Sequence, residues 1–323
     1  MIEEIQRNLF RLRIPLPDTP LKYLNAYLVR AAGKSLLIDT GFKHDACLKA
    51  MMNGLSEIGV GLDQLDILIT HFHADHFCLA PTLATERTQI WFNRPEAEIL
   101  ESWEGFGEML AYAGANGFPQ NDLKKALDAH PGSNFGSDWM PEFEFLSDGR
   151  KITYGDYCFT CIETPGHTLG HICLYEAGKR ILVSGDHILI DITPNIQCWS
   201  DRSNPLESYL ASLTKVYALD VDLVLPGHRR LFKDHRRRID ELRRHHDQRL
   251  SEVMQILASG DKNAYQTAAQ MTWDIKADCW DEFPVAQKWF AMGEAIAHLR
   301  CLEERGRVKS STNGGIKRYA PLE

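Results

Sequence analysis

Apolar runs bounded by turn residues recur along the first part of the chain and predict buried β-strands. The predicted strands cover residues 25–30, 35–39, 67–69, 157–162, 180–183 and 221–225. The segment between the first two strands is short and includes Gly33, so these strands are expected to form a hairpin. Residues 44–58 have a helical pattern of apolar positions instead. This part of the chain therefore combines strands and helices in an α/β fold.

Histidine and aspartate residues gather where these strands end. Residues 70–76, with the sequence THFHADH, directly follow the strand at 67–69 and hold three histidines and one aspartate. Glycine-marked turns after later apolar stretches deliver His167, Asp186 and His228. Imidazole and carboxylate groups suit zinc, iron or manganese, and one tight cluster could contribute to the coordination shells of two ions. A histidine-rich surface loop is the alternative, and four potential ligands at one strand end argue against it.

Seven of these side chains resemble, in type and spacing, the ligand set of the metallo-β-lactamase superfamily in its glyoxalase II-like form. They are His71, His73, Asp75, His76, His167, Asp186 and His228. Asp39, within the sequence LLIDTG, matches the first motif of that superfamily, and the resemblance covers about residues 8–232. It implies a four-layer αββα sandwich with two divalent metal ions in a cleft at one edge of the sheets. Zinc is the expected metal, with iron and manganese as alternatives.

The resemblance also implies a role for each ligand. One ion is expected at His71, His73 and His167, the other at Asp75, His76 and His228, and Asp186 is expected to bridge them. Two ions about 3.5–4 Å apart lower the pKa of a shared water and polarise the oxygen of a substrate. Asp75 could orient that water, which makes Asp75 and Asp186 the expected catalytic carboxylates. Asp39 is expected to accept a hydrogen bond from a ligand imidazole, with an ordinary turn aspartate as the alternative.

The composition fits a soluble globular protein, since 44% of the 323 residues are hydrophobic. No apolar run approaches the roughly 20 residues of a membrane span, and the acidic N-terminus carries no signal-peptide pattern. The eight cysteines are therefore expected to be reduced thiols in a cytoplasmic protein. Cys158 and Cys161 have CxxC spacing, but in a strand they point to opposite faces, which favours core packing over a redox or metal site.

Two further segments leave alternatives open. Residues 95–131 form a helical insert that either covers the cleft or packs as an ordinary pair of surface helices. Residues 229–249 hold nine arginine or lysine residues against four acidic ones, although the whole chain has a net charge of −8. Apolar residues from Ile239 to Leu257 recur at spacings of three and four, which predicts an amphipathic helix. Its charged face is either solvated or borders the cleft and holds an anionic group of a substrate.

The end of the chain predicts helices over 263–271 and 284–305, followed by strands over 308–311 and 316–319. Asn313-Gly314 between these strands favours a tight hairpin. Helices followed by a hairpin resemble a winged helix. After a metallo-β-lactamase domain they resemble the branch that contains the β-lactamase-like endoribonuclease and some acyl-carrier-protein thioesterases. The expected domains are a catalytic domain over 1–232 and a small winged-helix-like domain over 233–323.

The basic residues of this terminal part are few. The helix over 284–305 balances its charges, and only the hairpin, with Lys309, Lys317 and Arg318, is clearly basic. Because duplex binding depends on many phosphate contacts, sequence-specific binding of duplex DNA is not expected. The terminal domain is instead expected to pack against the catalytic domain or against a second subunit in a homodimer.

The expected activity is that of a dinuclear metal-dependent hydrolase, in which a metal-bound hydroxide cleaves a thioester or related acyl ester of an anionic small molecule. An endoribonuclease that cleaves single-stranded RNA phosphodiesters is the first alternative, and a mono-iron enzyme that oxidises persulfides is the second. A nucleic-acid-binding protein with a structural metal site is a third, non-enzymatic hypothesis. A ligand set that leaves an exchangeable position argues against it, because structural metal sites are closed.

Overall fold

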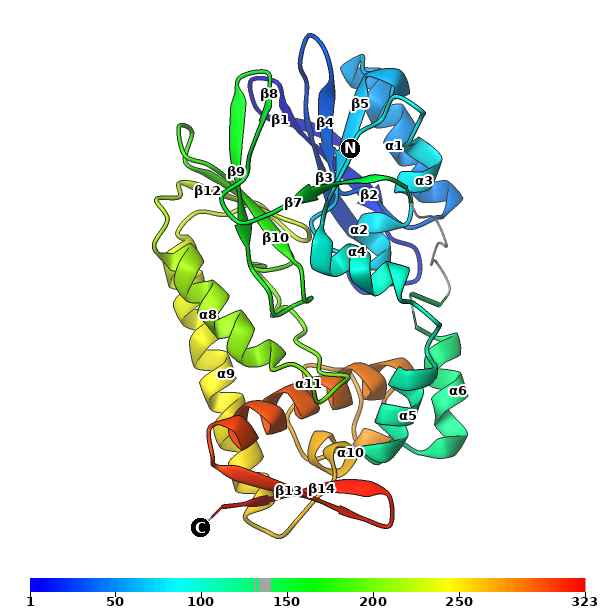
Figure 1. The fold of residues 1–323 in the computed structure, drawn as a ribbon, viewed down its shortest axis with the longest axis vertical. Coiled ribbons are helices and arrows are strands. Elements are labelled where there is room, and N and C mark those ends of the chain that lie inside the picture. The colour runs from blue at the N-terminus through cyan, green and yellow to red at the C-terminus, as the bar shows by residue number, and fades with distance from the viewer. Residues whose placement is uncertain (131, 134–140, 323) are drawn as a thin grey trace. The chain divides into compact units, whose positions relative to one another are not determined.

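The chain folds into two units, and the computed structural model describes its residues 1–130, 132–133 and 141–322 (Figure 1). The first unit consists of the described residues of Met1–Trp103, Phe135–Pro194 and Ser212–Arg238. The second consists of the described residues of Glu104–Asn134, Asn195–Ala211 and Ile239–Glu323. Two segments within residues 1–232 thus belong to the second unit. The division into domains at residue 232 stays a prediction.

The first unit contains a seven-stranded sheet whose strands follow the order of the chain. Its strands are β1 (Ile2–Gln6), β2 (Leu9–Pro15), β3 (Tyr23–Val29), β4 (Ser35–Ile38), β5 (Leu65–Leu68), β6 (Ile90–Asn93) and β7 (Phe143–Leu146). Neighbours from β1 to β4 are antiparallel, and neighbours from β4 to β7 are parallel. The predicted hairpin is β3–β4, with Tyr27 opposite Ile38. The crossover from β4 to β5 uses α1 (Asp45–Ile58) and the short 3-10 helix η1 (Leu62–Gln64).

A five-stranded sheet forms the second half of the sandwich, in the order β12-β11-β10-β9-β8. Its strands are β8 (Lys151–Tyr154), β9 (Tyr157–Glu163), β10 (Ile172–Glu176), β11 (Ile181–Gly185) and β12 (Leu223–Pro226). Only β11 and β12 are parallel within this sheet. On β9, Cys158 is exposed whereas Cys161 is fully buried, so the CxxC pair does point to opposite faces.

Two apolar cores hold these layers together. Leu24, Ala26 and Leu28 of β3 pack with α1, α2 (Ala74–Phe77), α3 (Ala80–Leu83) and α4 (Arg94–Glu101), whereas Tyr27 and Val29 pack between the sheets. Successive residues of a strand point to opposite faces, so a strand buried on both faces becomes a continuous apolar run. Leu213 and Val216 of α8 (Pro205–Tyr217) are fully buried as well. The predicted αββα sandwich is confirmed.

The second unit is mostly helical and ends in a hairpin (Figure 1). Its elements include α5 (Gly107–Ala115), α6 (Gln120–Asp128), most of α9 (His235–Leu257), α10 (Ala264–Ala268), η2 (Trp280–Glu282), α11 (Val285–Glu304), β13 (Val308–Asn313) and β14 (Ile316–Pro321). Helix α11 is buried along most of its length, with Met292 and Ile296 fully buried. A helix that is buried along most of its length belongs to a core. The winged-helix likeness of this unit stays a prediction.

Three sequence-based details need correction or comment. The predicted amphipathic helix is α9, which begins at His235, inside the basic segment 229–249, because Phe232 forms backbone hydrogen bonds with Val224 and extends the sheet edge. The hairpin β13–β14 turns at Gly314-Gly315, since Asn313 still pairs with Ile316. The predicted insert over 95–131 divides between the units, because α4 lies in the first while α5 and α6 lie in the second. Residue 131 lies outside the described residues, and a lid role for this insert stays a prediction.

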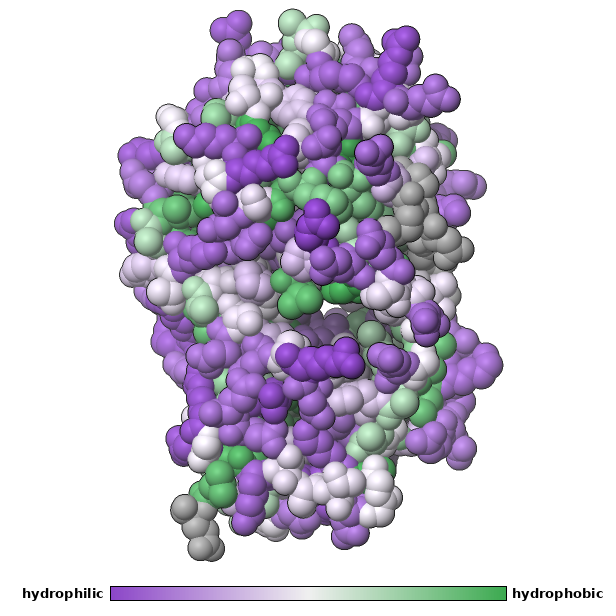
Figure 2. Space-filling view, in the orientation of Figure 1, coloured by the Kyte–Doolittle hydropathy of each residue, from purple (hydrophilic) through white to green (hydrophobic). Residues whose placement is uncertain are grey.

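The surface is strongly polar on the face drawn in Figure 2, where hydrophobic residues occur in smaller groups among hydrophilic ones. Among the described residues, no helix combines the length and the apolar composition needed to cross a membrane.

Candidate metal centre

The structure brings all seven predicted ligands together at one edge of the sandwich. His71 and His73 lie in the loop after β5, and Asp75 and His76 open α2. His167 lies in the loop between β9 and β10. Asp186 directly follows β11, and His228 follows β12 after Gly227. The carboxyl ends of parallel strands face the same edge, which explains how residues so far apart in the sequence meet.

The first group of ligands consists of three imidazoles. The Nδ1 atom of His73 lies 3.1 Å from Nε2 of His71 and 3.0 Å from Nε2 of His167. Burial and, to a smaller extent, the neighbouring His167 lower the pKa of His73 to about 3. Burial lowers the pKa of His71 as well, and neutral imidazole is the form that binds a metal ion, so His71 and His73 are held in the ligand form.

The second group combines Asp75, His76 and His228. The Nε2 atom of His228 lies 3.3 Å from Asp75 Oδ2, and Nε2 of His76 lies 3.9 Å from the same oxygen. Burial lowers the pKa of His228, but Asp186 and Asp75 outweigh burial and raise it to about 10. This group therefore attracts positive charge.

Asp186 lies between the two groups. Its Oδ1 atom is 3.7 Å from Nε2 of His76, and its Oδ2 atom is 3.7 Å from Nε2 of His167 and 3.4 Å from Nε2 of His228. The carboxylate thus faces ligands of both groups. Three candidate ligand triplets occur among the described residues, and the one that contains Asp186 also contains His71 of the first group and His76 of the second.

The buried atoms of the site fit divalent metal ions. The Nδ1 atom of His76 lies 2.8 Å from Asp39 Oδ2, and Nδ1 of His228 lies 3.0 Å from the carbonyl oxygen of Tyr23, so both Nε2 atoms face the centre. These two nitrogens and Asp186 Oδ1 are buried and have no hydrogen-bond partner among the described residues. Each such atom costs about 1–3 kcal/mol unless it binds something. Ligands about 2.1 Å from an ion in tetrahedral geometry are roughly 3.4 Å apart, which is close to the spacings found here.

Asp39 supports the site through hydrogen bonds to a residue next to the ligands and to one ligand. It adopts a left-handed backbone conformation with φ of 60°, and it accepts hydrogen bonds from the backbone N–H of Thr70 at 2.8 Å and from the Thr70 hydroxyl at 2.9 Å. Together with its contact to His76, it links β4 to the loop that carries the first histidines. A partner of this kind fixes the tautomer and the orientation of a ligand imidazole.

Thr70 and His171 support the site, a role that the sequence analysis did not assign to them. The Nε2 atom of His171 accepts a hydrogen bond from the backbone N–H of Asp186 at 3.1 Å, which leaves that imidazole outside the ligand groups. Its Nδ1 atom lies 2.8 Å from the hydroxyl of Thr164. Neither residue stands out by spacing, because a threonine or a histidine near a strand end is common.

Glycine is required at position 227, next to the ligand His228. A Cβ atom there would lie 2.5 Å from Asp186 Oδ1 and 2.9 Å from Cε1 of His76. We expect Gly227→Ala to displace these two ligands and to lower metal affinity by at least 10-fold, as loss of ligand orientation does elsewhere. Metal titration followed by calorimetry measures this. Gly33→Ala is the control, since a Cβ at Gly33 meets nothing within 4 Å, and equal affinities of the two variants would contradict the expectation.

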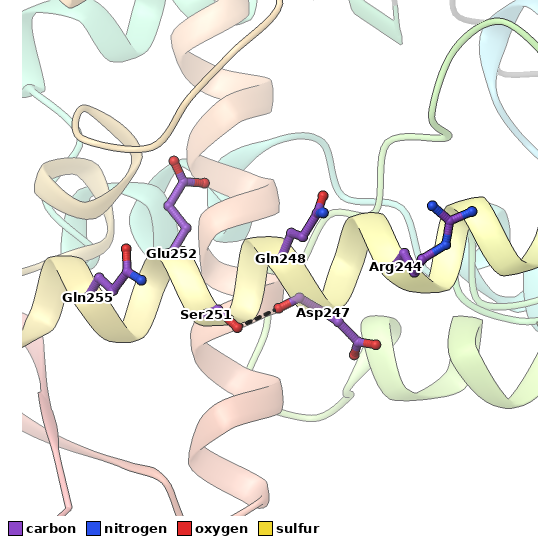
Figure 3. A pocket seen from close by; sticks show the side chains of 6 residues that line it. All are labelled: Arg244, Asp247, Gln248, Ser251, Glu252 and Gln255. Atoms are coloured by element: carbon purple, nitrogen blue, oxygen red, sulfur yellow. Dashed lines mark hydrogen bonds between the residues drawn. The ribbon is translucent and has the colours of Figure 1, made fainter.

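A shallow groove in the second unit is a less convincing site. It is lined by Arg244, Asp247, Gln248, Ser251, Glu252 and Gln255, which all lie along one face of α9 (Figure 3). The hydroxyl of Ser251 donates to the carbonyl oxygen of Asp247 within the helix. Side chains from a single helix face do not converge on one point, as the groups of a catalytic site must.

Several arginines of the basic segment have structural partners. Arg238 donates to the carbonyl oxygens of Leu189 and Ile192, and Arg236 donates to those of Tyr217 and Leu219. Arg230 pairs with Asp191. These residues tie the start of α9 to loops of the first unit, which reduces the number of cations available to a substrate.

Comparison with known protein families decides the identity of the fold. Residues 20–228 match the model of the metallo-beta-lactamase superfamily. The chain belongs to the metallo-β-lactamase superfamily. Residues 250–322 match a second model, the metallo-beta-lactamase-like C-terminal domain. Both parts of the chain are thus those of a metallo-β-lactamase superfamily protein with an additional terminal domain.

Among known superfamily members, the probable metallo-hydrolase YqjP of Bacillus subtilis is 24% identical over 97% of this chain and 97% of its own length. The human acyl-coenzyme A thioesterase MBLAC2 is 28% identical over 63% of this chain and 72% of its own length. A metallo-beta-lactamase family protein from Thermus thermophilus has a similar structure, with a TM-score of 0.83, 27% identity and coverage of 99% of this chain and 100% of that one. These hydrolase relatives confirm, at the level of the superfamily, the prediction of a metal-dependent hydrolase.

Proposed function

We propose that this protein is a dinuclear metal-dependent hydrolase, with a glyoxalase II-like ligand arrangement, that cleaves a thioester or related acyl ester of an anionic small molecule. The observation that carries the proposal is the position of Asp186, whose two carboxylate oxygens face His76 on one side and His167 and His228 on the other. The thioester is favoured because one relative is named an acyl-coenzyme A thioesterase.

In this proposal His71, His73 and His167 would hold one ion and Asp75, His76 and His228 would hold the other. Asp186, which faces both groups, would be a ligand shared between them. When bound, the two ions, proposed to be zinc, would lower the pKa of a water molecule and polarise the carbonyl of the substrate. The remaining tasks fall to the residues of the chain. Asp39 and the carbonyl of Tyr23 orient His76 and His228 through their Nδ1 atoms.

Asp75 is the proposed group that orients the attacking water. Burial raises the pKa of Asp75, but His76 and His228 outweigh burial and lower it to about 2, so the group is an ionised carboxylate. One of its oxygens, Oδ2, lies 3.3 Å from His228. The other oxygen remains to accept a hydrogen bond from water and to direct its lone pair toward the substrate carbon.

Two alternatives fit the same ligands less well. Cleavage of single-stranded RNA would need cations that contact the backbone, but Lys317 pairs with Asp201 and Arg318 pairs with Asp261. Persulfide oxidation at one iron would leave the second group, Asp75, His76 and His228, without a role. We propose the cytoplasm as the location of the protein. We also propose that it can form a homodimer in which the second unit contacts the other subunit.

Removal of metal is the direct test of the proposed function. Purified protein is expected to hold about two transition-metal ions per chain and to hydrolyse acyl thioesters, because the site offers ligands for two. Dialysis against a chelator should abolish hydrolysis, and added zinc should restore it. Elemental analysis, combined with a panel of thioester, lactone and single-stranded RNA substrates before and after dialysis, measures both. Chelator-resistant thioester hydrolysis, or activity toward RNA alone, would refute the proposal.

A further inference from the structure

Glu96, at the start of α4, is a fully buried carboxylate with no role in the site as described so far. Its two oxygens accept hydrogen bonds from two backbone N–H groups outside its own helix. Oε2 accepts from Phe72 at 2.8 Å, and Oε1 accepts from Gly170. A buried carboxylate is costly, and burial raises the pKa of Glu96 to about 7. A group retained at that cost needs a physical explanation.

The two N–H groups belong to the two loops that carry the first ligand group. Phe72 stands between His71 and His73, and Gly170 follows His167 by three residues. One carboxylate therefore joins the loop after β5 to the loop between β9 and β10, although the two loops belong to different sheets.

Both backbone polar groups of Gly170 form hydrogen bonds with side chains. The side-chain amide of Asn93 donates to its carbonyl oxygen at 2.9 Å, while its N–H donates to Glu96. A Cβ atom at this position would lie 2.7 Å from Cγ of Glu96, so the approach of the carboxylate requires a glycine. The loop of His167 is thus placed relative to α4 and not only relative to its own strands.

Only a carboxylate can serve both donors. A glutamine at position 96 would offer one oxygen and one amino group, and the amino group would face a second N–H donor. The second ligand group does not depend on this link, because Asp39 supports His76 and the carbonyl of Tyr23 supports His228. Asp39 also binds Thr70 at the start of the loop after β5, whereas both contacts of Glu96 lie in the two loops of the first ligand group.

We infer that Glu96 is a positioning residue that sets the affinity of the ion site formed by His71, His73 and His167, and that it does so without contacting the ion. The inference rests on the proposed dinuclear site. Its consequence is selective: loss of the carboxylate separates the two loops, so the distances among these three imidazoles change while Asp75, His76 and His228 stay in place.

Glu96→Gln tests the inference by metal binding rather than by activity. Metal-free protein is titrated with Co²⁺, whose absorption reports each site, and with Zn²⁺ in competition. Wild-type protein is expected to bind two ions. The variant is expected to bind one of them 10- to 100-fold more weakly, as loss of an outer hydrogen-bond partner does at metal sites, and the other with unchanged affinity. Thermal unfolding of the metal-free proteins checks that both are folded.

Glu294→Gln is the matched control. Glu294 is also a buried glutamate, with a pKa that burial raises to about 7, but its partners Asn195 and Arg249 belong to the second unit. This variant is expected to keep both affinities. Gly170→Ala keeps the carboxylate but pushes it away, and it is expected to reproduce the selective loss, which covers the case in which Glu96→Gln fails to fold.

The possible outcomes separate this inference from the proposed function. Two unchanged affinities in Glu96→Gln would overturn the inference and leave the dinuclear hydrolase intact. Equal weakening of both ions would also overturn it, because that pattern indicates a general loss of structure. A wild-type protein that binds fewer than two ions would refute the dinuclear site itself, and the inference would fall with it.

Discussion

Asp186→Ala is expected to lose both metal ions and essentially all hydrolytic activity. Asp186 Oδ1 is buried without a hydrogen-bond partner among the described residues, and Oδ2 lies between His167 and His228. No neutral side chain supplies charge to two ions at once, so removal of the carboxylate weakens both groups. The loss should exceed the roughly 100-fold that removal of an outer partner causes.

Elemental analysis and a thioester assay on the same preparation measure this effect. Asp191→Ala is the matched control, because Asp191 lies on the same loop and its partner is the exposed Arg230. The control is expected to keep both ions. If the Asp186→Ala protein retains a single tightly bound iron, the dinuclear interpretation is wrong and the persulfide-oxidising alternative gains support.

Truncation after Leu231 is expected to yield insoluble protein. The truncated chain would retain the described residues of Glu104–Asn134 and all of Asn195–Ala211, which belong to the second unit, but would lose their partners. Trp199 stacks on Trp289 at 4.3 Å, and the ring of Phe118 lies 5.6 Å from that of Trp289. Exposure of a fully buried aromatic side chain costs about 1.5–3 kcal/mol.

The truncation would also remove hydrogen bonds between the segment Asn195–Ala211 and α11. Asn195 donates to Glu294 at 3.1 Å, and the backbone N–H of Cys198 donates to the carbonyl of Gly293 at 3.0 Å. Solubility and circular dichroism of residues 1–231 measure the effect, and co-expression with residues 232–323 as a separate chain is the control, since the partners are then supplied. A soluble, folded and metal-loaded fragment 1–231 on its own would contradict the expectation.

Sequence patterns predicted the positions of strands and turns where interactions between neighbouring residues decide the local structure. Apolar runs bounded by turn residues placed β3, β4, β5, β9 and β11 within a few residues, because apolar character and turn chemistry are properties of neighbouring residues. The hairpin β13–β14 was predicted as well, but its turn was displaced by one residue. Both Gly314 and Gly315 have positive φ, at 57° and 79°, which this tight turn requires at its two central positions.

The sequence by itself determined the ligand types and their order, since His71, His73, Asp75 and His76 stand together and His167, Asp186 and His228 each follow an apolar strand. Tertiary structure decided everything that depends on contacts between distant segments. It placed the Asp186 carboxylate between two ligand groups, turned Nε2 of His228 inward through the carbonyl of Tyr23, and brought Glu96 to two loops at once. It also assigned Asn195–Ala211 to the second unit. Periodicity shows which face of a strand or helix is buried, but not which distant element covers it, because that choice follows from how the layers pack.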